Sequence, residues 1–588
     1  MDASKVERPL PSATNALFGS DIVAETLRAL DIPWIALTPG ASYRGLHDSL
    51  VNHLGNETPQ MLVCLHEESA VALAHGWAKV TGRPMAAAVH SNVGLFHATM
   101  AIFNAWCDRA PLLVIGATGP VDAAKRRPWI DWIHTAQDQG AIVRPYVKWD
   151  AQPASPAAAR EALLRANWLT RTAPQGPVYV NLDAGMQEAA VTEPLPAVEP
   201  ARFMPPQVAA ASPPAIAQAA AMLRQASHPV ILMGRVSRDE TAWQQRLALA
   251  ESLGARVATD IKTGAAFPTD HALHIGVPAT FPGDALKDAL RSADLILSLD
   301  WVDLGGTLTA ACGPVLTAQV IQVSLDHHLH NGWSMDHQAL PTVDLLLPAE
   351  PDSVVAALLT ELDVVVVPHQ TKPAPVPTQD PAAGTISVSG LAKTLRAVTV
   401  GRAVSLLHLP LGWNAADWPL HHPLDYIGGN GGAGVGAGPG IAVGAALALR
   451  DSGRLPVAVV GDGDFLMGVT ALWTAVHYRI PLLVIVANNR SFFNDEVHQE
   501  RVARMRGRPV ENRWIGQRLA DPEIDLAQMG RAQGTAGFGP IFRAEELPAA
   551  LRDAVAAVAA GGVAVVDVRV EPGYTPAMAR EMTRDANP

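Results

Sequence analysis

The chain has 588 residues, of which 49% are hydrophobic and 17% are charged, so a disordered chain and a coiled coil are both excluded. Its length indicates about three or four domains. The net charge is −12 without a run of basic residues, which argues against a nucleic-acid partner. Cys64, Cys107 and Cys312 lie far apart and form no metal-ligand spacing, which fits a reducing cytoplasm.

Neither the first residues nor the one long uncharged stretch predicts a membrane segment. Residues 1–15 carry charges of both signs and no apolar core, so we expect no signal peptide and a cytoplasmic location. Residues 430–449 are uncharged, but they are rich in glycine and interrupted by Pro439. This stretch predicts a loop followed by a short helix, and we expect no membrane partner.

Two proline-rich stretches, 194–214 and 368–381, predict linkers. They divide the chain into three expected domains, 1–190, 191–367 and 368–588. Each domain alternates short apolar runs with amphipathic stretches, which favours the α/β class with three doubly wound parallel sheets. The predicted strands cover residues 33–37, 61–65, 85–89, 111–115 and 177–181, then 229–233, 255–259, 294–299 and 319–323, and finally 403–407, 456–460, 481–486 and 563–569.

A short internal similarity links the first and third domains. Residues 109–117 read RAPLLVIGA and residues 479–487 read RIPLLVIVA, and an amphipathic helix precedes each. The match favours a shared topology for these two domains.

Two adjacent glutamates begin the predicted helix that follows the second strand. At helical spacing, Glu67 shares a face with small apolar residues, whereas Glu68 shares a face with His75 and Lys79 that we expect to be solvated. We therefore expect Glu67 to be the more buried of the two, and burial raises the pKa of a carboxyl. The alternative is an ordinary acidic residue in the first turn of a helix.

The strongest local signal lies in the third domain. Gly461-Asp462-Gly463 follows one apolar strand, and Asn488-Asn489 follows the next after 24 intervening residues, 464–487. If the two strands are neighbours, Asp462 and Asn489 meet at one edge of the sheet. Carboxylate and amide oxygens there suit a hard cation that also holds phosphate. The alternative, that both motifs are ordinary turns, explains each one singly but not their spacing.

This pattern resembles the thiamine-diphosphate fingerprint, and the whole chain is similar to the family of acetolactate synthase, pyruvate oxidase and benzoylformate decarboxylase. The resemblance implies pyrimidine-binding, central and diphosphate-binding domains in that order. It implies that Mg²⁺ is held by Asp462, Asn489 and the carbonyl of Ser491, and that Val435 keeps the cofactor bent. The cofactor-binding residues that it implies are Gly434, Val435, Gly461, Gly463, Asp464 and Phe492.

The resemblance also implies that Glu67 contacts the aminopyrimidine of the cofactor and activates it. His90 directly follows a strand and lies in a histidine-serine-x-x-glycine turn similar to that of the decarboxylase, which implies proton transfer. The alternative is that His90 only caps the strand end. We expect His97, one turn further along an apolar helix, to be a core histidine.

The chain departs from the decarboxylase pattern in several places. The serine beside its first glycine turn corresponds here to Ala41 or Ser42, its second histidine has no counterpart in the central domain, and HLPLG at 408–412 replaces the hydroxyls that anchor the diphosphate. Gln137 is a third catalytic candidate, in a segment that also carries Arg126, Arg127, Trp129 and Trp132. No glycine-rich nucleotide loop follows the first central strand, so we expect no FAD.

The expected reaction is non-oxidative decarboxylation of a small 2-oxo acid. The alternative is an acetolactate-synthase-like carboligase or a hydroxyketone or diketone lyase. A thiamine-diphosphate-binding protein without activity is disfavoured because both the glutamate and the metal residues are present. The resemblance implies a homodimer or homotetramer whose active sites are shared between chains. The substrate and any regulatory subunit are left open.

Overall fold

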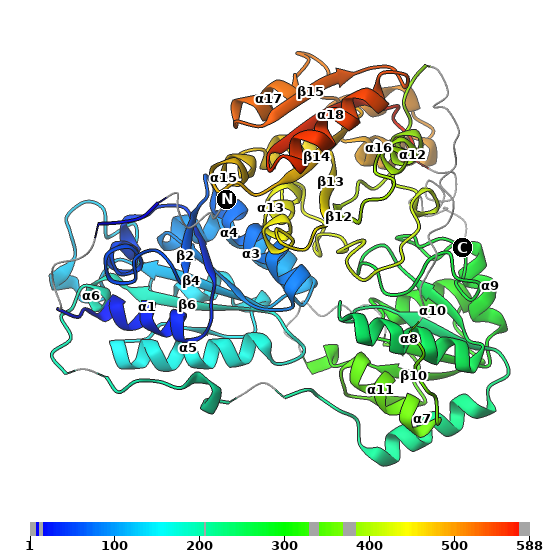
Figure 1. Ribbon diagram of the computed structural model, residues 1–588, viewed down its shortest axis with the longest axis horizontal. Coiled ribbons are helices and arrows are strands. Elements are labelled where there is room, and N and C mark those ends of the chain that lie inside the picture. Colours follow the sequence, from blue (N-terminus) through cyan, green and yellow to red (C-terminus); the bar gives the residue numbers. More distant parts are fainter. Residues whose placement is uncertain are drawn as a thin grey trace.

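The computed structural model describes residues 7–10, 16–193, 195–204, 207–328, 340–368 and 384–574. They form three parallel sheets of six, five and five strands, each within one of the three expected domains (Figure 1). The predicted α/β class is therefore confirmed. The second predicted linker lies outside the described residues apart from its first residue, and the domain boundaries stay a prediction.

The N-terminal sheet has the order β2-β1-β3-β4-β6-β5. Its central strands are buried along their whole length, so they need apolar helices on both faces. Helices α1 and α5 pack on one face, and α3 and α4 pack on the other. The elements are α1 Gly19–Ala29, β1 Trp34–Leu37, α2 Arg44–Asp48, β2 Gln60–Val63, α3 Glu67–Thr81, β3 Met85–Val89, α4 Ser91–Cys107, β4 Leu112–Thr118, β5 Asp150–Ala151, α5 Pro156–Arg171, β6 Pro177–Asp183 and α6 Ala184–Gln187.

The central sheet has the order β11-β10-β9-β7-β8, so the chain reverses direction across the sheet beside β7. Helices α7, α8 and α11 cover one face, and α9 and α10 cover the other. The elements are α7 Pro213–Gln225, β7 Pro229–Met233, α8 Glu240–Leu253, β8 Arg256–Thr259, α9 Asp284–Ser292, β9 Leu295–Leu299, α10 Leu304–Cys312, β10 Gln319–Val323, β11 Leu345–Leu347 and α11 Pro351–Glu361.

The C-terminal sheet has the order β12-β13-β14-β16-β15. Helices α12 and α18 cover one face, and α13 and α15 cover the other. The elements are α12 Val388–Val398, β12 Val404–His408, α13 Gly438–Ala448, β13 Leu455–Gly461, α14 Asp462–Gly468, α15 Ala471–His477, β14 Leu482–Asn488, α16 Phe493–Met505, α17 Leu526–Ala532, β15 Ala536–Ile541, α18 Leu547–Ala559 and β16 Val563–Arg569.

The first and third sheets share one topology, as the internal similarity predicts. Leaving out the edge strand β2, the N-terminal sheet runs β1-β3-β4-β6-β5, which is the same chain order as β12-β13-β14-β16-β15. The two similar nonapeptides lie on β4 and β14, the third strand of each series. The carboxyl ends of β3 and β4 are therefore equivalent to those of β13 and β14.

Helix α3 joins the N-terminal domain to the C-terminal domain by packing against α13 (Figure 1). Glycines make this contact close, because a Cβ atom on Gly76 would lie 1.9 Å from the carbonyl oxygen of Ile441. His75 is fully buried and the Lys79 side chain is only 6% exposed. The face of α3 that we expected to be solvated is therefore an interdomain contact, and that expectation is wrong.

One arginine of the central domain connects all three domains. Arg238 donates hydrogen bonds to the carbonyl of Lys79 in the N-terminal domain and to the carbonyls of Pro423, Tyr426 and Ile427 in the C-terminal domain. Among the helices of the described ranges, none is long and apolar enough to cross a membrane.

Candidate active site

Asp462 and Asn489 converge as their strand-end positions predict. Strands β13 and β14 are neighbours, with Gly461 opposite Ala487, so the residues that follow the two strands lie side by side. The backbone N–H of Ser491 lies 3.2 Å from Asp462 Oδ2 and 2.9 Å from Asn489 Oδ1 and donates to both. The sheet edge thus gathers two side-chain oxygens beside Ser491.

The buried carboxylates at this edge suit a divalent cation. Asp462 is 5% exposed, and burial raises its pKa against the opposing effect of backbone N–H donors, including that of Gly463. The other carboxyl, Asp464, accepts from Gly436 and Gly438, but its Oδ2 accepts no hydrogen bond from the described residues and lies 3.6 Å from His408 Nε2. Mg²⁺ prefers oxygen ligands and is usually bound by one or two carboxylates.

The glycine-rich loop 428–437 carries Val435, which is 48% exposed. The loop is anchored on the N-terminal domain, because Gly432 donates to Asn104 Oδ1 and the Lys79 amine donates to the carbonyl of Gly429. A Cβ atom on Gly434 would lie 2.5 Å from Met100. The position of Val435 therefore depends on α3 and α4.

The two glycines that flank Asp462 differ in their surroundings. A Cβ atom on Gly463 would lie 2.6 Å from the ring of Phe492, so this position has no room for a side chain. A Cβ atom on Gly461 would meet open space within the described structure. Gly461 therefore presents bare backbone to the cavity, whereas Gly463 packs against Phe492.

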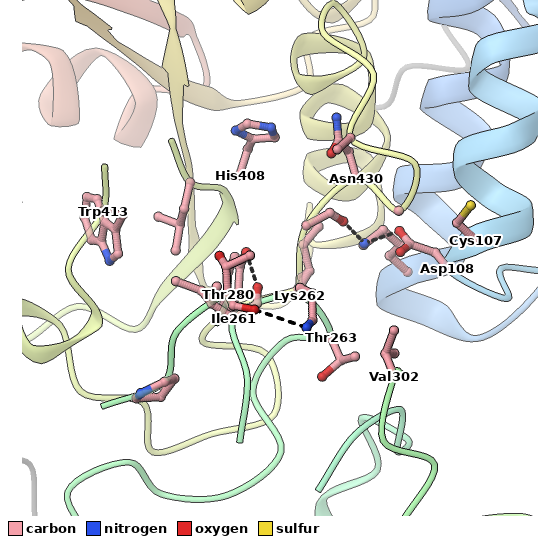
Figure 2. Close-up of a pocket in the computed structure, with 18 of the residues that line it drawn as sticks. Cys107, Asp108, Ile261, Lys262, Thr263, Thr280, Val302, His408, Trp413 and Asn430 are labelled. Carbon is pink, nitrogen blue, oxygen red and sulfur yellow. Dashed lines mark hydrogen bonds and ion pairs between the residues drawn. The ribbon is translucent and has the colours of Figure 1, made fainter. Parts of the chain in front are cut away.

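An interdomain cavity of about 1770 Å³ opens at this sheet edge. Figure 2 shows side chains from all three domains around it, such as Asp108, Lys262 and His408. His408 lines the cavity at the place where the expected hydroxyls are missing from the sequence. All the predicted metal and cofactor residues line the cavity: Gly434, Val435, Gly461, Asp462, Gly463, Asp464, Asn489, Ser491 and Phe492.

The central-domain part of this cavity ends at the carboxyl ends of β7 and β9. There Arg235 pairs with Asp300 at 2.9 Å and with Asp326 at 3.0 Å, and Arg109 pairs with Asp326. These carboxylates neutralise the arginines beside the cavity. The expected absence of FAD stays a prediction.

The predicted catalytic residues lie apart from this cavity. Among the described residues that line the interdomain cavity, Glu67, His90 and Gln137 are absent. Glu67 is 8% exposed at the start of α3, and Gly94 leaves room for its carboxylate, since a Cβ there would lie 2.9 Å from Oε1. Glu67 therefore lies on the carboxyl edge of the N-terminal sheet.

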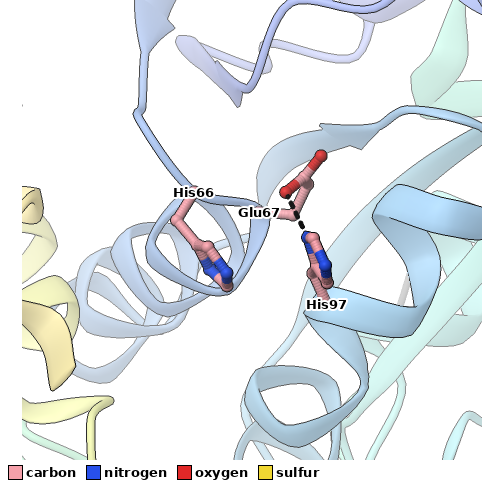
Figure 3. A group of neighbouring side chains, drawn as sticks. All are labelled: His66, Glu67 and His97. Carbon is pink, nitrogen blue, oxygen red and sulfur yellow. Dashed lines mark hydrogen bonds and ion pairs between the residues drawn. The ribbon is translucent and has the colours of Figure 1, made fainter.

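Two histidines flank Glu67 (Figure 3). Nδ1 of His97 lies 3.2 Å from Glu67 Oε2, and the His97 ring stacks on the ring of His66 with centroids 4.9 Å apart. The His97 side chain is 59% exposed, so the expectation of a core histidine is wrong. Its place one turn beyond Gly94 on α4, facing the start of α3, is the signal that sequence reasoning missed.

Ser42 holds His90 on the same edge. Ser42 Oγ lies 2.8 Å from His90 Nδ1 and accepts from the N–H of Ser91, whereas which of Ala41 and Ser42 corresponds to the decarboxylase serine stays a prediction. A Cβ atom on Gly40 would lie 2.4 Å from the imidazole, so the ring packs directly on this glycine. Burial lowers the pKa of His90, and the charge of His134 lowers it further.

The segment 119–139, after β4, carries the predicted residues Arg126, Arg127 and Gln137. Arg127 pairs with Asp131 at 2.9 Å and Arg126 donates to the carbonyl of Pro120, so neither guanidinium is without a partner. Gln137 is exposed, and its catalytic role stays a prediction. The residue of this segment that contacts His90 is His134, which sequence reasoning did not select.

Large apolar side chains surround this cluster and are exposed to solvent. They come from the residue before His66, from α4 and from the segment after β4. Exposed apolar side chains gathered around polar residues are typical of an interaction or binding surface. The residues are Leu65, Val93, Phe96, Trp129, Trp132 and Ile133.

Comparison with known families agrees with this arrangement. Three models described as thiamine pyrophosphate enzyme domains match in order: the N-terminal TPP binding domain at residues 18–142, the central domain at 216–331 and the C-terminal TPP binding domain at 411–568. Together they cover more than half of the chain. The chain belongs to the thiamine pyrophosphate enzyme family. Thiamine pyrophosphate is the same compound as thiamine diphosphate.

Similar proteins within the thiamine pyrophosphate enzyme family include decarboxylases and a synthase. Benzoylformate decarboxylase of Pseudomonas aeruginosa is 24% identical over 84% of this chain and 89% of its own length. A probable 2-ketoarginine decarboxylase of the same organism is 27% identical over 90% of this chain and 89% of its own. The large subunit of acetolactate synthase from Lactococcus lactis is 25% identical over 84% of this chain and 83% of its own.

Solved structures of this fold superpose over nearly the whole chain. Benzoylformate decarboxylase from Polynucleobacter necessarius gives a TM-score of 0.76 at 21% identity and covers 95% of this chain and 99% of its own. A 4-hydroxybenzoylformate decarboxylase of Rhodococcus jostii gives 0.74 at 21% identity and covers 95% and 100%. These structures establish the three-domain fold of this thiamine pyrophosphate enzyme.

Proposed function

We propose that this protein decarboxylates a small 2-oxo acid to an aldehyde, without net oxidation, with thiamine diphosphate and Mg²⁺. The observation that carries the proposal is the position of the His90 imidazole at a strand end. Its Nδ1 lies 2.8 Å from Ser42 Oγ, and the ring is close enough to Glu67 for the charge of that carboxylate to act on it. An imidazole at this place suits delivery of the proton that an aldehyde needs.

Asp462, Asn489 and the carbonyl of Ser491 would hold Mg²⁺. The fit rests on the buried Asp462 carboxylate and on the convergence of two side-chain oxygens at one sheet edge. The nearby N–H groups at the start of α13 are already bonded to Asp464. The cation would therefore supply the positive charge that a diphosphate needs here.

Thiamine diphosphate, when bound, accepts the electron pair that is released as carbon dioxide leaves. Glu67 would hold a proton at N1′ of the aminopyrimidine, a role that suits a carboxyl shielded from water. Because Nδ1 of His90 contacts Ser42, its Nε2 is the nitrogen left to exchange a proton with the substrate.

We further propose that each active site is shared between two chains. In one chain Glu67 and His90 lie outside the cavity that the metal residues line, and exposed apolar side chains surround them. A second copy that covers this surface would complete the site and bury these side chains. The assembly would be a homodimer or a dimer of such dimers.

The second candidate is carboligation, or the reverse lyase reaction. It is favoured by one observation, that an acetolactate synthase subunit is as similar to this chain as the decarboxylases are. In that reaction a second carbonyl compound takes the place of the proton. Exposed Trp129 and Trp132 would line the entry of such an acceptor.

Product identification decides between the two. Holoenzyme is incubated with pyruvate, benzoylformate and 2-ketoarginine, each with and without an acceptor aldehyde, and the products are identified by mass. Aldehyde release without acceptor supports decarboxylation. A hydroxyketone as the main product without free aldehyde supports carboligation and overturns the first proposal.

A further inference from the structure

The shared topology of the two cofactor domains points to a residue that the proposed function does not yet use. In the C-terminal domain, the residues after β13 and β14 converge to bring Asp462 and Asn489 together. Strands β3 and β4 are the equivalent neighbours in the N-terminal domain. Their ends bring together His90 and His134.

The two imidazoles are in direct contact. The ring centroids of His90 and His134 lie 4.8 Å apart with planes at 83°, an edge-to-face arrangement. His90 directly follows β3, whereas His134 lies in the segment after β4. The contact therefore does not follow from sequence proximity.

The backbone of His134 is fixed to the end of β4. Gly119, which follows the strand, donates to the carbonyl of His134 at 3.0 Å, and His134 donates to the carbonyl of Asp131. Asp131 is buried and in turn holds Arg127. This arrangement gives a long surface segment a defined position beside His90.

Several groups face His90 from the surrounding elements. Ser42 contacts its Nδ1, Tyr43 packs edge-to-face at 6.5 Å, and Glu67 lies in its electrostatic neighbourhood. The cations on this side are Arg127 and, when protonated, His134. Two neighbouring imidazoles resist holding two charges at once, so a proton taken up by one ring disfavours a second proton on the other.

We propose that His134 is a second proton-transferring residue beside His90. It would take the place of the decarboxylase's second histidine, which has no counterpart in the central domain of this chain. This inference rests on the proposed decarboxylase function. In that reaction, one 2-oxo acid anion and one proton give one aldehyde and one carbon dioxide. The bond from the carbonyl carbon to the carboxylate breaks, and a bond from that carbon to hydrogen forms.

The two histidines would have different roles because their rings have different surroundings. His90 is fixed through Ser42 and its pKa is lowered by burial, so it would lend a proton to the keto oxygen of the 2-oxo acid and take the same proton back before the aldehyde leaves. His134, partly exposed on the other side, would deliver the proton to carbon and regain it from water.

The test uses full-length holoenzyme with His134→Asn, and His53→Asn as the matched control. His53 is an exposed histidine of the same domain that pairs with Glu25. With the fastest 2-oxo acid of the three named above, His134→Asn should lower aldehyde release by about 100-fold. Its affinity for thiamine diphosphate, measured by calorimetry, should match that of the wild type.

A second measurement does not depend on turnover. Diethyl pyrocarbonate acylates neutral imidazole, so the rate of His90 acylation against pH, followed by peptide mass spectrometry, reports the His90 pKa. Removing the charge of His134 should move the midpoint to higher pH by about half a unit, the size expected for two charges about 5 Å apart in water. His53→Asn should leave the midpoint in place.

The possible failures are distinguishable. If His134→Asn releases aldehyde within twofold of the wild type, or if the His90 midpoint does not move, His134 has no part in proton transfer. If the wild type releases no aldehyde from any of the three acids, the proposed decarboxylation is overturned, and the proton-delivery role falls with it.

Discussion

Oε2 of Glu67 lies 3.2 Å from Nδ1 of His97, whereas the side chain of the next residue, Glu68, is directed to the C-terminal domain. Glu68 Oε1 lies 3.9 Å from the position that a Cβ would take on Gly436, and burial raises the pKa of Glu68, with a further contribution from the charge of Asp464. Adjacent glutamates thus belong to different clusters.

The two glutamates therefore give a sharp comparison. Glu67→Gln should bind thiamine diphosphate but slow exchange of its acidic ring proton by about 100-fold, because the carboxyl can no longer exchange a proton with the aminopyrimidine. Glu68→Gln is the matched control and should exchange at nearly the wild-type rate. Proton-exchange NMR measures both, and the reverse order would transfer the role to Glu68.

Asp462→Ala should abolish Mg²⁺-dependent retention of thiamine diphosphate, because it removes the buried carboxylate at the sheet edge. Isothermal calorimetry with cofactor and Mg²⁺ measures the loss. Asp451→Ala, at an exposed turn before β13, is the control. Wild-type affinity in the Asp462 variant would exclude a metal role for this residue.

The raised pKa of Asp462 also predicts how metal-free stability depends on pH. A carboxyl whose folded pKa lies above its unfolded value holds its proton more firmly in the folded state, so stability falls as pH rises through that interval. At neutral pH without Mg²⁺, Asp462→Asn should therefore raise the melting temperature, by roughly 2–4 °C for each kcal/mol relieved.

Calorimetric scans between acidic and neutral pH check this prediction. With Mg²⁺ and thiamine diphosphate the order should reverse, because only the wild-type carboxylate gains the cation. Equal melting temperatures in both conditions would show that burial of this carboxylate has no energetic consequence.

Complementation between chains tests the shared site. Glu67→Gln and Asp462→Ala chains should each be inactive alone, and a mixture should regain activity after subunit exchange, because some sites then combine one intact half from each chain. Each variant mixed with itself is the control. An active monomer in light scattering would contradict the proposal.

Arg238→Ala should destabilise the protein by about 1–3 kcal/mol, the usual loss when hydrogen-bond acceptors are left without their donor. Arg238 is half-buried and donates to carbonyls of the other two domains, so the variant should also lower the cooperativity of thermal unfolding. Arg256→Ala, exposed on the central domain, is the control. Calorimetry measures both, and equal traces would refute this prediction.

Most of the fold could be predicted because buried parallel strands are short apolar runs bounded by turns. Each predicted strand is present, with ends shifted by at most three residues. The missed strands have weak signals: β5 has two residues, β11 has three, and β15 contains glycine and proline in AGFGPI.

Within the site, residues fixed by strand ends were the predictable ones. Asp462 and Asn489 follow neighbouring strands directly, so their convergence followed from sheet order, and His90 follows a strand directly as well. His97 and His134 were missed because their contacts depend on how α4 and a long surface segment pack, which periodicity does not report. The buried face of α3 was missed for the same reason, since α13 and Asp108 cover it.

The start of α3 would couple two active sites of the proposed assembly. Glu67 would contact the cofactor of one site, while Glu68, on the same helical turn, faces the loop that carries Val435 of another. A helix packed on glycines has little freedom to move one residue without the other. Filling one site would therefore change the affinity of its neighbour, and cofactor titrations of the intact assembly would depart from a simple hyperbola.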